Sequence, residues 1–157
     1  MKSQFDLLSL NTMNRSITRV TRALSTVAKA NPPKLFEYEK ITANLKPSIK
    51  VIDAVESAFG MLAKGRVEVP LPMHIGIHES PSAGPGDCHI KGGYVEEATT
   101  WTVKLANVSF YNNLKKGLPA GSGIFIVCDA TNGFPLGIFQ ENRYLTDLRT
   151  GAAGAIR

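Results

Sequence analysis

Three histidines and a cysteine are the residues whose type and clustering most suggest a metal site. His74, His78, Cys88 and His89 could bind zinc if the segments that carry them converged. Their spacing matches no known zinc signature, and a Pro-, Ser- and Gly-rich loop over 79–86 separates the first pair from the second. The pattern therefore predicts no metal site.

Two glycine pairs have the spacing that begins a nucleotide-binding loop. They are Gly84 with Gly86, and Gly121 with Gly123. A dinucleotide fingerprint requires a strand, then G-x-G-x-x-G, then a helix. The first pair lies in the Pro/Ser loop, and the second precedes a predicted strand and lacks the third glycine. The pattern therefore predicts no nucleotide-binding βαβ unit in this sequence.

Two cations have surroundings that suit anion binding. Lys104 lies in a predicted strand over 101–108, on the face opposite its apolar residues. It is either solvated or directed into a cleft, where it could bind a carboxylate or polarise an imine. Arg149 and Thr150 are predicted in the first turn of a final helix, where helix N-termini favour anions. An exposed ion pair with Asp147 is the alternative for Arg149.

The elements that must position these residues form a predicted α+β domain. Pro47 is predicted in the first turn of a helix, with apolar residues at helical spacing up to Leu62 and a stop at Gly65. An edge strand over 66–77 contains two prolines. Further strands are predicted over 88–95, 101–108, 123–128 and 136–140, and the continuous apolar run over 123–128 fits a central strand covered on both faces. Asn132-Gly133 marks a hairpin, and Thr146 is expected to cap a last helix over 147–157.

Four segments of the sequence resemble the ornithine cyclodeaminase/mu-crystallin family. They are VIDAVESAFGMLAKGRVEVP (51–70), VKLANVSFYNN (103–113), KGLPAGSG (116–123) and DATNGFPLGIFQENRYLTDLRTGAAGA (129–155). The details FYNN, GLP and ENRYLTDLRT are most similar to the branch of ectoine-utilisation and iminosuccinate-reductase-type proteins. The resemblance covers roughly residues 47–157.

This resemblance implies a fold, a cofactor and a partner. The family's N-terminal domain has a mostly antiparallel sheet with flanking helices, and it builds the substrate pocket and the homodimer interface. A Rossmann domain follows and binds NAD or NADP. We expect residues 31–157 to be the N-terminal domain, ending before the Rossmann domain and inactive alone. The implied reaction is hydride transfer in an imine reductase or amino-acid deaminase acting on a small amino or imino acid; the alternative is a non-catalytic ligand-binding module of the mu-crystallin type.

The resemblance also implies roles for individual residues. Lys104 matches the family's substrate-pocket lysine, and Arg149 matches an arginine that contacts the substrate carboxylate or the cofactor. Thr150 would help to hold the dinucleotide. Where many members have a carboxylate-binding arginine, the nearest candidate is His74, which would bind an anion only while protonated. Ser122 would substitute for a cofactor-side hydroxyl that Ala120 lacks.

The first thirty residues carry most of the net charge of +5. Their apolar and arginine residues form two stripes at helical spacing, and the segment is rich in Ser and Thr and contains one acid, Asp6. This composition predicts a mitochondrial transit peptide over 1–30, and hence a matrix protein, with a basic amphipathic surface helix and a cytoplasmic protein as the alternative. The nearly neutral remainder argues against nucleic-acid binding, and no apolar run approaches the length of a membrane span.

The predicted last helix has a face of small and apolar residues, including Leu148, Ala152 and Ile156. Nothing after it in this sequence could cover that face. We therefore expect a dimer or larger species with a frayed C-terminal helix. The apolar strand faces around Val103 and Ile126 are expected to meet a second copy.

Overall fold

The computed structural model describes residues 31–156 as seven strands and three α-helices. The strands are β1 (Lys34–Phe36), β2 (Val67–Glu68), β3 (Met73–Ile77), β4 (Gly86–Val95), β5 (Thr100–Val108), β6 (Ser122–Asp129) and β7 (Pro135–Gln140). The helices are α2 (Tyr38–Asn44), α3 (Ile49–Ala63) and α4 (Tyr144–Ala155), with a 3-10 helix η1 (Tyr111–Lys116) between β5 and β6. The predicted transit peptide over 1–30 lies outside the described residues.

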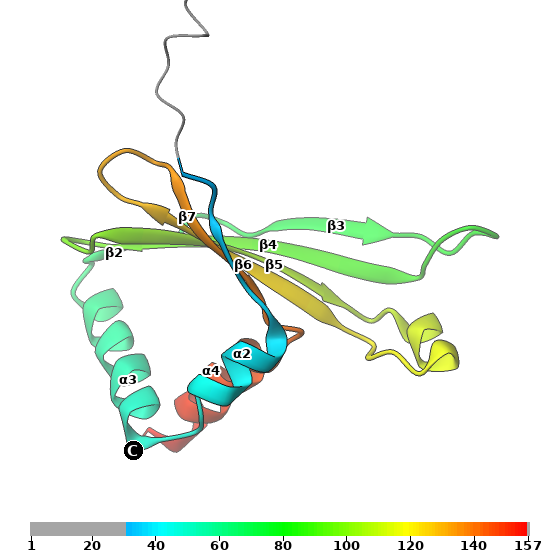
Figure 1. The fold of residues 1–157 in the computed structure, drawn as a ribbon, viewed down its shortest axis with the longest axis horizontal. Coiled ribbons are helices and arrows are strands. Elements are labelled where there is room, and N and C mark those ends of the chain that lie inside the picture. Colours follow the sequence, from blue (N-terminus) through cyan, green and yellow to red (C-terminus); the bar gives the residue numbers. More distant parts are fainter. Residues whose placement is uncertain (1–30, 157) are drawn as a thin grey trace, which may run out of the picture. The chain divides into compact units, whose positions relative to one another are not determined.

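All seven strands join one sheet in the order β1-β7-β6-β5-β4-β2, and β3 also pairs with β4. Every pairing is antiparallel except that of β1 with β7. Figure 1 shows the three α-helices on the lower side of the sheet in that view. The predicted α+β class, with a mostly antiparallel sheet and flanking helices, is confirmed.

The strand β6 is central in the sheet, as its apolar run predicts. It lies between β5 and β7 and is joined to β7 by the predicted hairpin, where Gly133 has the positive φ of 77° that the turn requires. Only Gly123 and Cys128 of this strand are buried, and its other side chains are half-buried. The expectation of full cover on both faces is therefore wrong within the described part of the chain.

The predicted edge strand over 66–77 is divided into β2 and β3. Both strands pair with β4, β2 near its end and β3 near its beginning. Pro70 and Pro72 lie between them, and because proline has no amide hydrogen the pairing is interrupted there.

The helix α3 matches the predicted amphipathic helix, but Ser48 is its N-cap, so Pro47 precedes the helix and does not lie in its first turn. Gly65 has the positive φ of 70° expected just after a helix end. The helix packs against α4, and none of its side chains is buried. Within the described residues its apolar side chains are therefore half-buried or exposed, with Phe59 and Leu62 among the exposed ones.

Sequence patterns did not predict β1, α2 or η1. The three residues of β1 are too few to show a periodicity, and they are held by pairing with β7 and by stacking of Phe36 on Phe139 at 4.4 Å between ring centroids. The seven-residue α2 is anchored by Ile41, which is buried. Within residues 31–156 no helix is long and apolar enough to cross a membrane.

Strand register separates the side chains of the sheet into two faces, because paired residues point the same way. One face, which we call the lysine face, carries His74, Asp87, His89, Lys91, Lys104 and Phe125. The other, which we call the apolar face, carries Leu35, Ile90, Trp101, Val103, Leu105, Ile124, Ile126 and Ile138. The N-terminus of α4 contacts the lysine face, where the hydroxyl of Thr146 meets the ammonium of Lys104.

The beginning of α4 differs from the prediction. The helix starts at Tyr144, three residues earlier than expected, and its N-cap is Arg143 in the left-handed conformation with φ 71°. Thr146 therefore lies inside the first turn and does not cap the helix. Arg149 and Thr150 consequently lie in the second turn, and the prediction that places them in the first turn is wrong.

Candidate functional site

The candidate site is built around Lys104, in the middle of β5. Its neighbours across the sheet are Lys91 on β4 and Phe125 on β6. The ammonium lies 5.5 Å from the centroid of the Phe125 ring and donates a hydrogen bond of 2.6 Å to Oγ1 of Thr146. The side chain is half-buried, which decides against the fully solvated alternative.

The electrostatic environment makes Lys104 costly to protonate. Partial burial lowers the pKa of its ammonium, and the nearby charges of Arg149, Lys91 and Arg143 lower that pKa further. Glu141 is the carboxylate that acts in the opposite direction on this pKa. An anion placed beside Lys104 would therefore relieve the repulsion among several cations, which is the condition expected of an anion-binding site.

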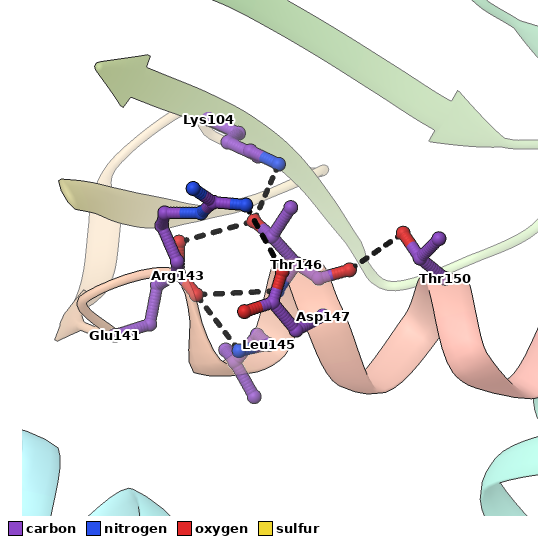
Figure 2. Close-up of polar contacts among 7 residues, drawn as sticks. All are labelled: Lys104, Glu141, Arg143, Leu145, Thr146, Asp147 and Thr150. Carbon is purple, nitrogen blue, oxygen red and sulfur yellow. Dashed lines mark hydrogen bonds and ion pairs between the residues drawn. The ribbon is translucent and has the colours of Figure 1, made fainter. Parts of the chain in front are cut away.

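Glu141, just after β7, is fully buried. One oxygen of its carboxylate, Oε2, accepts hydrogen bonds from the backbone N–H groups of Leu145 at 2.7 Å and Thr146 at 3.2 Å. The other oxygen, Oε1, lies 3.2 Å from Oγ1 of Thr146 (Figure 2). This carboxylate satisfies the free N–H groups at the start of α4, which is the role that Thr146 was predicted to have.

The G-S-G segment makes room for the residues around this carboxylate. A Cβ atom at Gly123 would lie 2.5 Å from Oε1 of Glu141, and a Cβ atom at Gly121 would lie 2.6 Å from Cδ of Arg143. Both distances are too short for any side chain. These glycines are therefore explained by close packing of the α4 start onto β6, and not by a phosphate loop.

Arg149 is exposed on α4, and its charge lies close enough to lower the pKa of Lys104. The ion pair suggested for it with Asp147 is absent from the described residues, because Asp147 instead pairs with Arg143 at 3.4 Å. Thr150 donates its hydroxyl to the carbonyl of Thr146 at 2.8 Å. In this structure that hydroxyl is therefore hydrogen-bonded within the helix.

Two other predicted site residues lie elsewhere. His74 shares the lysine face but contacts Asp87, with 2.9 Å between Nε2 and Oδ1, and His89, with 4.9 Å between ring centroids. Ser122 accepts a hydrogen bond of 3.2 Å from Asn107 and lines a cavity of about 710 Å³ together with Tyr38 and Gln140. Of these residues, Arg149 therefore lies near enough for its charge to act on Lys104, whereas His74 and Ser122 lie in separate groups.

The histidines and Cys88 do not form a metal site in the part of the chain that the structure describes. No group of three or more His, Cys, Asp or Glu side chains there is arranged to hold a metal ion. His74 and His89 lie on the lysine face, whereas Cys88, adjacent to His89 on β4, points to the other face because strand side chains alternate. Both cysteines are buried free thiols.

Sequence reasoning missed Glu141, Thr146 and Lys91 as site residues. Two signals could have found Glu141 and Lys91. Glu141 directly follows a strand and precedes a helix, where an acid is favoured by the helix dipole. Lys91 lies on a strand whose alternation, once paired with β5, places it opposite Lys104.

Comparison with known proteins connects this chain with a family. The model of the ornithine cyclodeaminase/mu-crystallin family matches residues 34–157. The alanine dehydrogenase of Archaeoglobus fulgidus is 33% identical over 107 residues, which is 68% of this chain and 30% of that protein.

Two solved structures have the same fold over most of the chain. An archaeal alanine dehydrogenase dimer with bound NAD has a TM-score of 0.66 at 27% identity, and the match covers 78% of this chain and 35% of that one. The Δ1-pyrroline-2-carboxylate reductase of Thermococcus litoralis, in complex with NADH and L-proline, has a TM-score of 0.66 at 29% identity, with 77% and 35% covered. The chain thus spans about a third of the length of these relatives.

Proposed function

The chain belongs to the ornithine cyclodeaminase/mu-crystallin family, and from this premise we propose that it forms the substrate-binding and dimerisation part of an NAD(P)-dependent imine reductase or amino-acid deaminase. The observation that carries the proposal is that Lys104, which is hydrogen-bonded to Thr146 in the first turn of α4, lies within range of the charge of Arg149 in the second turn. Lys104 and Arg149 lie on different elements, 45 residues apart in the sequence, and the charge of Arg149 lowers the pKa of Lys104.

The proposed ligand is the carboxylate of a small amino or imino acid. The ammonium of Lys104 donates one of its three N–H groups to Thr146, so two remain for a substrate oxygen. The guanidinium of Arg149 can present a fork of N–H donors to the same carboxylate. Held in this way, the carbon next to the carboxylate has a fixed position, which is what a hydride transfer to or from that carbon requires.

A nicotinamide cofactor would supply the hydride chemistry. The glycines of the G-S-G segment are packed against Glu141 and Arg143, and the hydroxyl of Thr150 bonds to the helix backbone, so these groups are already engaged within the chain. NAD or NADP is therefore proposed to be held mainly by residues outside 31–156, while residues within this range bind and orient the substrate.

A homodimer is part of the proposal, and the apolar face of the sheet would be its contact surface. Most of that face is half-buried or exposed in a single chain, with Leu35 at 53% exposure on β1. An exposed apolar surface spanning several strands favours a protein–protein interface. The related archaeal alanine dehydrogenase is a dimer, which supports this assignment.

Binding of carboxylates to the 157-residue chain tests the proposed function. Isothermal titration with L-proline, L-alanine and pyruvate at pH 7.5 should give saturable binding, and Lys104→Met should weaken it at least tenfold. Asp87→Asn, which changes a charge on the same sheet face outside the Lys104 contacts, is the matched control and should bind as the unaltered chain does. Equal binding by the Lys104→Met and unaltered chains would contradict the proposal.

The mitochondrial location is also proposed, on the composition of residues 1–30. Fusion of these residues to a fluorescent protein should direct the fusion to mitochondria. A fusion in which Arg15, Arg19 and Arg22 are replaced by Gln should remain in the cytosol. A cytosolic signal from the unaltered fusion would oppose the proposal.

A further inference from the structure

A chain of hydrogen bonds connects the buried carboxylate of Glu141 to the ammonium of Lys104 through one hydroxyl. The ammonium donates to Oγ1 of Thr146 at 2.6 Å, and that oxygen lies 3.2 Å from Oε1 of Glu141 (Figure 2). A threonine hydroxyl has a single proton, and a protonated lysine can only donate. The proton of Thr146 must therefore point to Glu141, and a lone pair of the hydroxyl must point to Lys104.

The Glu141 end of this chain is held rigidly. Its Oε2 is fixed by the N–H groups of Leu145 and Thr146, and its Oε1 lies over Gly123, where a side chain would collide with it. The carboxylate is fully buried and so cannot exchange these partners for water. A fixed acceptor orients the hydroxyl, and an oriented hydroxyl in turn fixes the direction of the ammonium.

We infer that Glu141 is a positioning residue that acts on Lys104 through the hydroxyl of Thr146, holding the ammonium charged and turned so that its two remaining N–H donors face the substrate carboxylate. The inference rests on the proposed function, because the proposed function identifies the anion as a substrate carboxylate. Glu141 itself touches neither the substrate nor Lys104 in this arrangement.

The charges around Lys104 show why it needs such support. Lys91 faces it from β4, Phe125 from β6, and Arg143 and Arg149 from the start and second turn of α4. Each of these three cations lowers the pKa of Lys104, as does its burial, whereas Glu141 raises it. Among these groups, Glu141 is therefore the one that favours the protonated form of Lys104, and the hydroxyl of Thr146 connects the two side chains.

The test is a titration of Lys104 itself, which requires no substrate. With lysine labelled at Cε with ¹³C, the Lys104 signal, assigned by its loss in Lys104→Met, is followed from pH 7 to 11 in the 157-residue chain and its variants. Glu141→Gln and Thr146→Val should both lower the pKa of Lys104, while Thr146→Ser, which keeps the hydroxyl, should restore it. Thr150→Val is the matched control, because that hydroxyl bonds only to a backbone carbonyl, and it should leave the titration unchanged.

The inference has a second readout, which separates it from the proposed function. At pH 9 Thr146→Val should bind carboxylate about tenfold more weakly than Thr146→Ser, as expected when a charged hydrogen-bond donor loses its orientation. Thr146→Val keeps Glu141 and its bond to the Leu145 N–H, so it remains informative if Glu141→Gln does not fold. An unchanged Lys104 titration in folded Thr146→Val would overturn the inference, whatever the binding results. If the pKa of Lys104 changes in the variants but no chain binds carboxylate, the role of Glu141 as a positioning residue is supported and the proposed function is overturned instead.

Discussion

Lys91 on β4 and Lys104 on β5 are direct partners in the sheet, and their side chains share one face. Like charges opposite each other destabilise a sheet, and within residues 31–156 neither lysine forms an ion pair with a carboxylate. Lys104 is half-buried and Lys91 is exposed. The pair therefore presents two positive charges to solvent at the edge of the proposed carboxylate site.

The Lys91–Lys104 pair predicts a preference for substrates with two acidic groups. A substrate carboxylate on Lys104 and Arg149 leaves Lys91 free for a second one. Lys91→Met should weaken binding of oxaloacetate about tenfold and leave binding of pyruvate within about twofold, since one charged hydrogen bond is worth roughly 1.5 kcal/mol. Isothermal titration of both acids measures how far each affinity falls. Lys115→Met, which replaces an exposed lysine on η1, is the control. Equal losses for both acids would refute the preference.

The contact between Gly123 and Glu141 predicts opposite effects for two glycine substitutions. Gly123→Ala would place Cβ 2.5 Å from Oε1 of Glu141, and we expect a loss of about 1–3 kcal/mol in the free energy of unfolding. A methyl group added at Gly60, inside α3, would meet nothing within 4 Å, so Gly60→Ala should gain about 1 kcal/mol from helix propensity. Urea denaturation of both variants measures the difference. A Gly123→Ala chain as stable as the unaltered chain would show that Glu141 can leave its buried position.

Lys104 is predicted to contribute to binding at the expense of stability. Lys104→Met removes a half-buried charge that is repelled by three other cations, while the methionine keeps a similar length and fills the same space. The variant should be about 1 kcal/mol more stable, as is common when a functional residue is replaced, and should lose carboxylate binding. Thermal and urea unfolding measure the stability. A destabilised variant would indicate that the bond to Thr146 is mainly structural.

Periodicity and turn chemistry were sufficient to predict much of the fold. The spacing of apolar residues over 52–62 predicted α3, and Asn132-Gly133 predicted the β6–β7 hairpin. Lys104 was identified from its strand alternation and from the family resemblance, and the structure places it against the start of α4, where it bonds to Thr146. These features depend on neighbours in the sequence, which a pattern can capture.

Other parts of the site depend on contacts between distant residues, which patterns do not show. The start of α4 was misplaced because the capping group is a side chain before the helix, Glu141, and not a hydroxyl at the expected N-cap, Thr146. The strand β1 is defined by its pairing with β7, which is about a hundred residues away in the sequence. Likewise, the separation of Ser122 from Arg149 follows from the sheet register, since Ser122 and its neighbour Gly123 point to opposite faces.

The lowered pKa of Lys104 predicts the pH dependence of both binding and stability. Carboxylate binding requires protonated Lys104, so it should begin to decline at a pH below the ordinary lysine value of about 10.4. Between the folded and unfolded pKa the unfolded chain binds more protons, so the free energy of unfolding should rise with pH across that alkaline window. Lys91→Met removes one repelling charge and should move the decline in binding to higher pH. Measurements of carboxylate binding and of the free energy of unfolding from pH 7 to 10.5 check both directions. A decline in binding that stays at the same pH in Lys91→Met would contradict the predicted shift.

The apolar face predicts how the chain associates. Val103 lies in the middle of this face, paired with Gly92 and Ile126, and is half-buried in the single chain. Val103→Glu would bring a carboxylate into an apolar interface, which costs several kcal/mol when no partner is available, whereas in a monomer the same side chain could reach water. Sedimentation velocity should show a dimer for the unaltered chain and for the surface control Lys115→Glu, and a monomer for Val103→Glu. Far-UV circular dichroism of the variant, matched to that of the unaltered chain, would show that the fold is retained. A dimer that persists in a folded Val103→Glu chain would exclude the apolar face as the contact surface.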